Sequence, residues 1–395
     1  MELQEDTMHA LPPDTTHDSL VVLWDRLYDA FSDLPDPRQT RTCAHPLVDI
    51  IAVAICAVIC GADSWVAVET FGKTKRAWLE RYLGLPNGIP SHDTFGRVFA
   101  ALDAAAFQRH FLAWVRTIWP PTCGECLSVD GKTMRGSHDD EAGKDAIHLV
   151  SVWAQQSRLV LAQQAVDAKS NEITAIPAVL ALLDLTGCTV SIDAMGCQTA
   201  IARQIVQQGG DYVLAVKDNQ EQLHSDIVDT FRSVADDAWQ DVAHAHTRTV
   251  EAAHGRIETR DYWLITEPDY LRFLNPKGLW RAVGGIGMVV RQRTIAGVTT
   301  HATGYYLLSG TPTIARFATA VRGHWGIENQ VHWVLDVTFH EDASRVRTGD
   351  GAQNFAVLRH IALNLLRREL SAGSLRTKRF RAALDETYLL QVLQA

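Results

Sequence analysis

The order of short apolar runs between residues 126 and 217 constrains the fold more than any other feature of this chain. Runs rich in Val, Ile, Leu and Trp, bounded by turns, predict strands at residues 126–130, 148–155, 159–166, 189–193 and 212–217. Helical patterns interleave with them at residues 172–185 and 198–208. This order of strand, strand, strand, helix, strand, helix, strand is typical of an α/β sheet with helices on its faces.

The segments that flank this core have different patterns. Residues 1–18 are polar and contain proline, which predicts a disordered tail, whereas residues 19–122 have helical spacing. After a helical stretch from residue 221, alternating runs at 247–256, 258–265, 282–294 and 299–308 predict strands. We therefore expect an all-helical N-terminal domain at 19–122, an α/β domain at 123–220 and 309–395, and a β-rich insertion at 221–308 between its parts.

Length, charge and cysteine content narrow the class of protein. A chain of 395 residues with 47% hydrophobic residues is ample for two or three globular domains. The net charge of −9 argues against a general nucleic-acid coat protein but leaves room for a DNA enzyme with local basic patches. The acidic start, an apolar run of only residues 50–60 and seven scattered cysteines predict a cytoplasmic protein without a membrane span.

Three carboxylates occupy positions that suit metal-dependent phosphoryl transfer. Asp130 and Asp193 end apolar runs that are predicted strands, and Glu328 lies on a helical pattern. A two-metal site holds its ions roughly 3.5–4 Å apart and stabilises the attacking and leaving oxygens of an in-line displacement. Magnesium prefers a few carboxylates together with waters and substrate phosphate oxygens. The three carboxylates therefore predict a site for two magnesium ions, with manganese as a substitute.

Each of these carboxylates also has a structural alternative. The pair Asp130-Gly131 could form a turn after the strand, and Asp193 could cap the next helix. Glu328 shares a helical face with Trp325 and His332, while Trp333 is expected to pack into the core. Three nearby acids compete with Glu328 for the third position, namely Asp336, Glu341 and Asp342.

Many short blocks in a fixed order resemble one protein family. The chain resembles the H-repeat-associated, ISAs-type group of bacterial insertion-sequence transposases from about Phe31 to Leu393. The blocks include Asp36-Pro-Arg38, Gly88-Ile-Pro-Ser-His-Asp-Thr-Phe95, Val129-Asp-Gly-Lys-Thr-Met-Arg-Gly-Ser137, Ile192-Asp-Ala-Met-Gly-Cys-Gln198, His324-Trp-Gly-Ile-Glu-Asn329 and Phe339-His-Glu-Asp342. These are DDE transposases, so the resemblance implies a ribonuclease H-like catalytic core in which Asp130, Asp193 and Glu328 are both the catalytic triad and the metal ligands.

The resemblance also implies the substrate and the assembly. It predicts cleavage of transposon ends and transfer of the freed strand into target DNA, by a homodimer or larger complex associated with the nucleoid. Related transposases place a tyrosine seven residues before the glutamate, an arginine four before and a lysine seven after. Here those positions are Val321, His324 and Leu335. Arg322 is a neighbouring source of the missing positive charge.

Candidate DNA contacts are basic and polar residues near the predicted site. In the catalytic domain and the insertion they are Lys132, Arg135, Lys169, Asn171, Lys217, Asn219, Arg256, Arg322 and His324. In the N-terminal domain a predicted helix at 92–102 displays His92, Thr94 and Arg97 and could enter a DNA groove. The alternatives are surface charge, helix capping and a plain helical bundle. The basic run at 359–381 is either a solvated face or a phosphate-binding stripe.

The sequence thus favours a DNA transposase and leaves two other functions open. One is a DNA-binding protein that has lost catalysis, for which the missing residues around Glu328 and the acidic net charge speak. The other is a metal-dependent nuclease that cuts DNA without joining it, because the same carboxylates serve both reactions.

Overall fold

The computed structural model describes residues 28–39, 43–118, 124–139, 143–166, 171–253 and 255–395. The predicted tail at 1–18 lies outside the described residues. The chain divides into two compact units, one of residues 1–98 with 361–395 and one of residues 99–360. In the part of the chain that is described, no helix is long and apolar enough to cross a membrane.

The described part of the first unit is helical. Its elements are α2 (Leu47–Ile59), α3 (Trp65–Thr74), α4 (Arg76–Leu79), most of α5 (His92–Ala101), the end of α13 (Gly351–Arg368), α14 (Leu375–Leu384) and α15 (Glu386–Leu393). The apolar helix α2 is almost wholly buried, as its composition predicts. Arg379 of α14 donates a hydrogen bond to the carbonyl of Val58, so the C-terminal helices pack beside α2.

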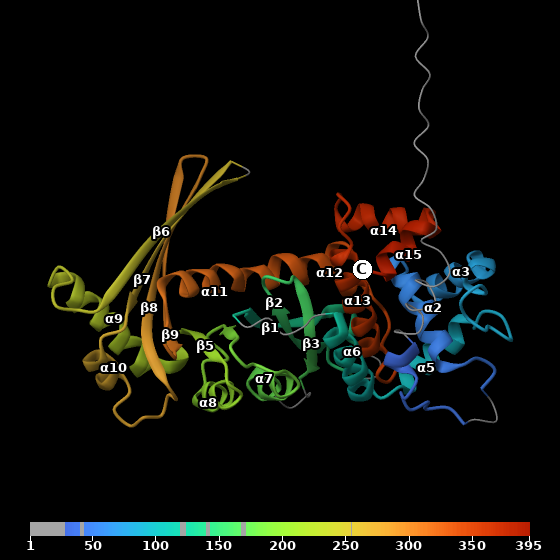
Figure 1. Cartoon of the computed structure of the whole chain (residues 1–395), viewed down its shortest axis with the longest axis horizontal. Coiled ribbons are helices and arrows are strands. Elements are labelled where there is room, and N and C mark those ends of the chain that lie inside the picture. Colours follow the sequence, from blue (N-terminus) through green and yellow to red (C-terminus); the bar gives the residue numbers. More distant parts are fainter. Residues whose placement is uncertain (1–27, 40–42, 119–123, 140–142, 167–170, 254) are drawn as a thin grey trace, which may run out of the picture. The chain divides into compact units, whose positions relative to one another are not determined.

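The second unit contains a nine-stranded mixed sheet in the order β3-β2-β1-β4-β5-β9-β8-β7-β6 (Figure 1). The strands are β1 (Cys126–Met134), β2 (Ile147–Ala154), β3 (Leu159–Ala165), β4 (Thr189–Ile192), β5 (Asp211–Val216), β6 (His244–Ala253), β7 (Arg256–Ile265), β8 (Val283–Ile295) and β9 (Val298–Ser309). β1 pairs antiparallel with β2 and parallel with β4, and β4 pairs parallel with β5. The predicted α/β class is therefore confirmed.

The strands of the insertion extend this sheet. β9 pairs antiparallel with β5, and β8, β7 and β6 follow as antiparallel neighbours. The pairing of Leu214 with Leu307 joins the two halves of the sheet. Sequence patterns identify these strands but contain no record of their pairing with β5, because the partners lie far apart in the chain.

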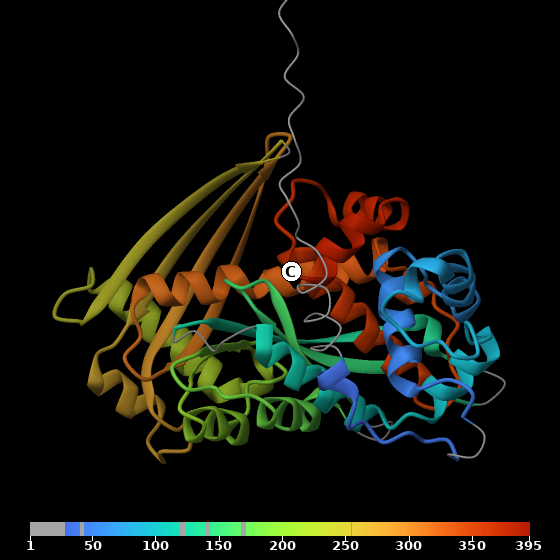
Figure 2. The ribbon, with the colours of Figure 1, turned by 45° about the vertical axis from the view of Figure 1, so that its right-hand side comes forward.

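Helices cover both faces of the sheet. The described helices of this unit include α6 (Ala104–Ile118), α7 (Glu172–Ala181), α8 (Thr199–Gln207), α9 (Glu221–Asp236), α10 (Pro268–Leu274), α11 (Ile314–Gly326) and α12 (Trp333–Val337). Figures 1 and 2 show α11 crossing one face of the sheet, while α7 and α8 lie on the other face. Between α11 and α12 the chain continues as a π-helical turn, Ile327–His332.

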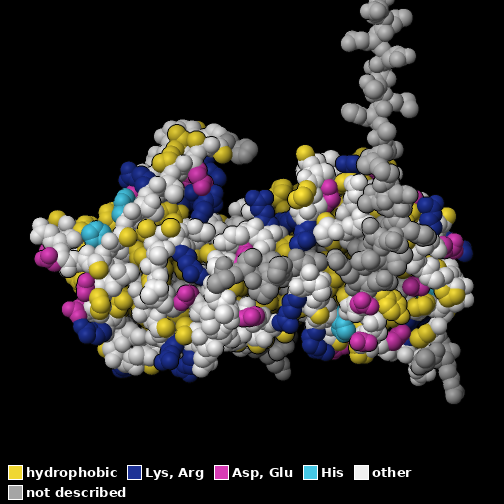
Figure 3. Space-filling model, in the orientation of Figure 1, with side chains coloured by type: hydrophobic (Ala, Val, Ile, Leu, Met, Phe, Trp, Pro, Cys, Tyr) yellow, Lys and Arg dark blue, Asp and Glu magenta, His cyan; other side chains and the backbone are white. Residues whose placement is uncertain are grey.

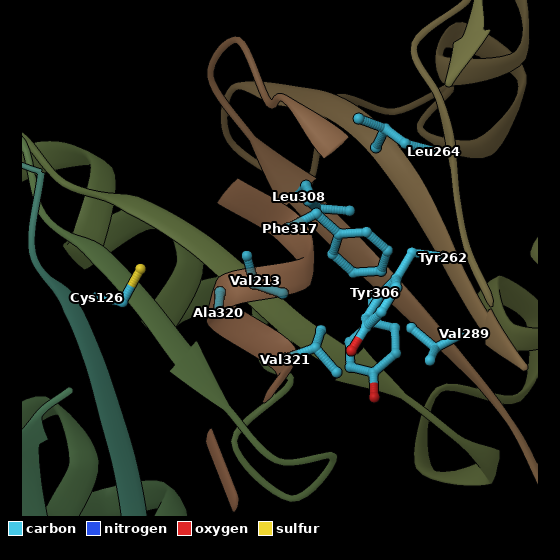
Figure 4. Close-up of a cluster of buried hydrophobic side chains, with 10 residues drawn as sticks. All are labelled: Cys126, Val213, Tyr262, Leu264, Val289, Tyr306, Leu308, Phe317, Ala320 and Val321. Atoms are coloured by element: carbon cyan, nitrogen blue, oxygen red, sulfur yellow. The ribbon is translucent and has the colours of Figure 1, made fainter. Parts of the chain in front are cut away.

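An aromatic cluster fixes α11 against the inserted strands (Figure 4). The Phe317 ring lies edge-on to Tyr262 and Tyr306, with ring centroids 6.0 and 5.4 Å away. Val321 and Ala320 of the same helix are buried in this cluster. Burial of large aromatic rings contributes strongly to packing, so α11 has a firm base from which to present its C-terminal end.

Two local predictions are wrong. β1 does not end at Asp130 but runs through Gly131 to Met134, so the Asp-Gly pair is not a turn. Trp333 is not in the core, because 56% of its surface is exposed. A π turn holds more residues than an α turn, so it rotates the following side chains away from the faces that α-helical spacing predicts.

Candidate active site

Parallel pairing of β1 with β4 brings the two aspartates together. Val129 is the register partner of Ile192, and Asp130 and Asp193 are the next residues on each side. Adjacent strands lie about 4.8 Å apart, so consecutive residues beyond this pair become neighbours. Asp193 follows the end of β4, where its Oδ1 accepts hydrogen bonds from the backbone N–H groups of Met195 and Gly196. It does not cap α8, whose first residue follows Gln198.

The π-helical turn brings Glu328 to the same place. His332 Nδ1 lies 3.1 Å from Glu328 Oε2 and 3.6 Å from Asp130 Oδ2. One ligand atom from each of Asp130, Glu328 and His332 lies within 4.8 Å of the others. Asp193 is outside this close group. Two carboxylates and an imidazole at such spacing are a donor set that fits a divalent cation.

A cavity of about 460 Å³ opens beside these residues. All three predicted carboxylates line it, together with His324, Lys217 and residues of the inserted strands. The inserted strands contribute Arg291, Thr303, Gly304, Tyr305 and Tyr306. The cavity therefore combines acidic, basic and aromatic side chains from the sheet, the insertion and α11.

Burial and mutual repulsion perturb the aspartates. Burial, followed by the neighbouring charges of Asp193, Glu172 and Glu328, raises the pKa of Asp130 to about 7. Burial and the charge of Glu172 also raise the pKa of Asp193. Carboxylates that repel one another in a partly buried site are stabilised by a cation between them. This electrostatic arrangement fits a metal site better than it fits a structural role.

Polar side chains support the site from both faces of the sheet. His148 Nε2 lies 2.6 Å from Glu172 Oε1, next to Gly131. On the α11 side, Ser191 Oγ lies 3.1 Å from His324 Nδ1, and burial lowers the pKa of His324 to about 4. His324 therefore stays neutral near pH 7 and cannot replace the arginine of related transposases as a cation.

The three acids that compete with Glu328 lie elsewhere. Lys132 Nζ is 2.8 Å from Asp336, 3.0 Å from Glu341 and 3.1 Å from Asp342. Burial disfavours the charged amine, but Glu341 and Asp336 outweigh it and raise the pKa of Lys132. None of the three acids lines the cavity. Lys132 itself is engaged by carboxylates and is not presented to solvent.

The other candidate DNA contacts in the second unit differ in whether their side chains already contact another part of the protein. Lys217 is exposed and lines the cavity. The remaining described side chains have partners of their own. Asn171 caps α7, and Asn219 donates a hydrogen bond to the carbonyl of Ala194. Arg256 lies 3.6 Å from Glu258, Arg135 lies 3.6 Å from Asp342, and Arg322 donates hydrogen bonds to Glu251. Lys169 lies outside the described residues.

Candidates in the first unit lie on α5. His92 contacts Glu69 through both its backbone N–H and its ring, and Arg97 donates to the carbonyl of Asp93. Thr94 contacts Ser91 at the start of the helix. His92 and Arg97 are exposed. These contacts are compatible with a plain helical bundle and with a DNA-contacting helix.

The basic run at 359–381 is not a continuous stripe. Arg359 is 1% exposed and lies over the Phe355 ring. Lys378 and Arg379 are also buried and donate to backbone carbonyls. On the face drawn in Figure 3, basic side chains are scattered among acidic ones and also occur over the long inserted strands. The charge run therefore serves packing at three of its positions.

Several residues at the site escape sequence reasoning. Arg291, Tyr305 and Tyr306 reach the cavity only because β9 pairs with β5 and β8. No local signal marks them. The proximity of His148 to Glu172 likewise depends on tertiary packing. The sequence does contain a signal for His332, because this residue lies four residues after Glu328 on the predicted helical face.

Comparisons with known proteins identify the family of this chain. Residues 121–365 match the family model described as Transposase DDE domain, and residues 28–115 match one described as DDE_Tnp_1-associated. The Escherichia coli K12 protein named "H repeat-associated putative transposase YhhI" is 38% identical over 374 residues, which are 93% of this chain and 97% of that protein.

Two further relatives extend the comparison. "Putative transposase YncI" of Escherichia coli O157:H7 is 40% identical over 380 residues, covering 93% of this chain and 94% of that protein. "Uncharacterized protein in dhlA 3'region" of Xanthobacter autotrophicus is 48% identical over 270 residues, covering 68% of this chain and 88% of that protein. The resemblance inferred from the sequence blocks is confirmed, and the chain belongs to the Transposase DDE domain family.

Proposed function

We propose that this chain is a DNA transposase that cleaves transposon ends and transfers the freed strand into target DNA. Family membership supports the reaction class. The observation that carries the proposal is the register of β1 with β4, which makes Asp130 and Asp193 neighbours, with Glu328 close to Asp130. A metal-dependent phosphoryl-transfer site needs this concentration of carboxylates.

The sheet topology supports a ribonuclease H-like core. β3-β2-β1-β4-β5 are neighbours in that order, with β2 antiparallel to β1 and with β4 and β5 parallel to it. The strands β6–β9 lie in the sequence between β5 and the helix that leads to Glu328. We assign residues 123–220 and 309–395 to this catalytic domain, 221–308 to the insertion and 19–122 to a DNA-associated domain.

In this proposal the three carboxylates together hold the metal ions. Asp130, the central member, would hold magnesium or manganese ions together with Asp193 and Glu328. When bound, such ions would activate the attacking water or hydroxyl and offset charge on the phosphate. Aromatic and apolar side chains of the cavity wall would lie beside the reacting phosphodiester. Lys217 is the exposed cation best placed in the cavity to contact a DNA phosphate.

The same site serves cleavage and joining. In cleavage a water oxygen forms a bond to phosphorus as the 3′ oxygen of the transposon end leaves. In joining that 3′ oxygen attacks a phosphodiester of the target and displaces another 3′ oxygen. Two transposon ends must be held together for this sequence, so we expect a homodimer or a larger complex on double-stranded DNA.

A cleavage assay tests the proposal directly. A labelled terminal repeat from the flanking DNA is incubated with magnesium or manganese and with the wild type, Asp193→Ala or Asp269→Asn. Asp269 is an exposed aspartate on α10, far along the chain from the site, and serves as the matched control. We expect nicking by the wild type and by Asp269→Asn, and none by Asp193→Ala. A pre-cleaved end with a free 3′ hydroxyl measures joining.

Each outcome separates the candidate functions. Joining by the wild type, lost in Asp193→Ala, supports transposition. Nicking without joining points to a nuclease that only cuts. Specific binding without nicking in every protein would overturn the catalytic proposal and favour a DNA-binding protein.

A further inference from the structure

His332 is buried beside the carboxylates and faces them. It is 4% exposed, and its Nδ1 lies 3.1 Å from Glu328 Oε2 and 3.6 Å from Asp130 Oδ2. The π-helical turn carries both Glu328 and His332, so one short segment presents a carboxylate and an imidazole to the strand that carries Asp130. Single π turns inside helices occur frequently at functional sites.

The other ring nitrogen argues against a purely structural histidine. His332 Nε2 is buried and has no hydrogen-bond partner among the described residues. Leaving a buried polar atom unpaired is unfavourable, so a histidine kept only for packing is normally paired on both sides. Among the described residues, the two carboxylates are the polar groups that this ring contacts at hydrogen-bond or ion-pair distance.

A buried carboxylate also acts on His332 through its charge. Glu341 is 2% exposed and contributes to the electrostatic environment of His332. Its Oε1 has no hydrogen-bond partner among the described residues and lies 3.7 Å from Arg359 Nη1. A histidine that binds a metal through one nitrogen usually donates its other N–H to a carboxylate, a carbonyl or water. The surroundings of His332 therefore suit a metal ligand.

We propose that His332 Nδ1 holds a divalent cation together with Asp130 and Glu328, and that this nitrogen makes the site prefer Mn²⁺ over Mg²⁺. The inference rests on the proposed function, because it concerns the same carboxylates. Mg²⁺ is held by oxygen ligands and accepts nitrogen reluctantly, whereas imidazole is a good ligand for transition-metal ions. The sequence signature of related transposases assigns no role to this position.

Metal binding, measured without DNA, tests the role of His332 apart from activity. Free Mn²⁺ is followed by electron paramagnetic resonance as the metal-free full chain is titrated, and Mg²⁺ affinity is obtained by competition. We expect His332→Ala to raise the Kd for Mn²⁺ about tenfold or more, with a smaller change for Mg²⁺. His332→Gln keeps most of the volume and offers an amide oxygen, so it should shift the preference toward Mg²⁺.

The control is His224→Ala, because His224 lines the same cavity but contacts Tyr305 and Asp218 instead of the carboxylate group. It should leave the Kd for Mn²⁺ unchanged. If both His332 variants fold and keep wild-type Mn²⁺ affinity while Asp130→Asn loses binding and DNA cleavage, the role of His332 is overturned and the proposed function stands. If Asp130→Asn also retains Mn²⁺ binding, the metal is not held here and both fail.

Discussion

Single residues show how closely the site is packed beneath Asp130. A Cβ atom at Gly131 would lie 2.2 Å from Glu172 Oε1 and 2.3 Å from His148 Nε2. Glycine is therefore required here for close approach and not for a turn, since β1 continues past it. The sequence identifies Asp130 because an apolar run leads up to it, but the crowding at Gly131 arises from side chains that are distant in the chain.

The substitution Gly131→Ala should accordingly separate His148 from Glu172. We expect a loss of about 1–3 kcal/mol in the free energy of unfolding, because an added methyl group in a packed site forces its neighbours to move. DNA cleavage should fall as well, since Glu172 contributes to the charge around both aspartates. Denaturant unfolding and the cleavage assay measure the two effects. Gly84→Ala is the control, because its Cβ would meet no atom closer than 3.9 Å; equal effects of both substitutions would contradict this account.

At the scale of elements, α11 transmits the packing of the insertion to the site. Phe317 anchors this helix against Tyr262 and Tyr306, and its C-terminal end leads into the turn that carries Glu328. Helical spacing in the sequence predicts the helix well. It does not predict the π turn, which depends on tertiary contacts. For that reason the predicted burial of Trp333 is wrong.

Phe317→Ala should therefore affect both stability and catalysis. Removal of a buried aromatic ring costs about 3–5 kcal/mol of unfolding free energy. We also expect slower DNA cleavage at a temperature where the variant is folded, because α11 loses its anchor. Phe317→Leu, which refills most of the volume, should recover much of both. Thermal unfolding and cleavage rates measured on the same preparations decide the matter, and a destabilised variant with an unchanged cleavage rate would refute the coupling.

A second group of elements, at the C-terminal end, is joined by a buried carboxylate. Glu369 accepts hydrogen bonds from Ser371 and Tyr388 and pairs with Lys378 of α14. Burial raises its pKa, but these partners outweigh burial and lower the pKa to about 2. A carboxyl group whose pKa is lower in the folded state stabilises the protein above its unfolded pKa of 4.5.

That contribution is lost as the pH falls from about 4.5 toward 2, as the glutamate becomes protonated. Glu369→Gln should lower the unfolding free energy at pH 7 by about 2 kcal/mol and by much less near pH 2.5. Unfolding by urea at both pH values measures the difference. Glu386→Gln, at a more exposed carboxylate that pairs with Lys75, is the control. A loss that is the same at both pH values would show that packing, not charge, explains the effect.

At the scale of the whole molecule, the sequence predicts the helices and strands better than it predicts which of them pack together. Residues 361–395 fall in one compact unit with residues 1–98, and the inserted strands continue the central sheet. Both facts depend on contacts between distant parts of the chain, which local patterns do not encode. The net charge of −9 is similarly uninformative about DNA, because it does not show that Lys132 and Arg322 are already paired with carboxylates.

The distribution of free and paired cations predicts how DNA binding responds to salt. Each phosphate contact made by Lys or Arg contributes about 0.9 to the slope of log K against log salt concentration. Lys217 is exposed in the cavity, so Lys217→Gln should weaken terminal-repeat binding and reduce that slope by about 1. Lys132 is 10% exposed and surrounded by Asp336, Glu341 and Asp342, so Lys132→Gln should leave the slope unchanged while lowering the unfolding temperature.

Fluorescence anisotropy across a salt series, with metal absent to prevent cleavage, measures both variants. A reduced slope for Lys132→Gln with no change for Lys217→Gln would reverse the assignment and place the DNA backbone on the other side of Asp130.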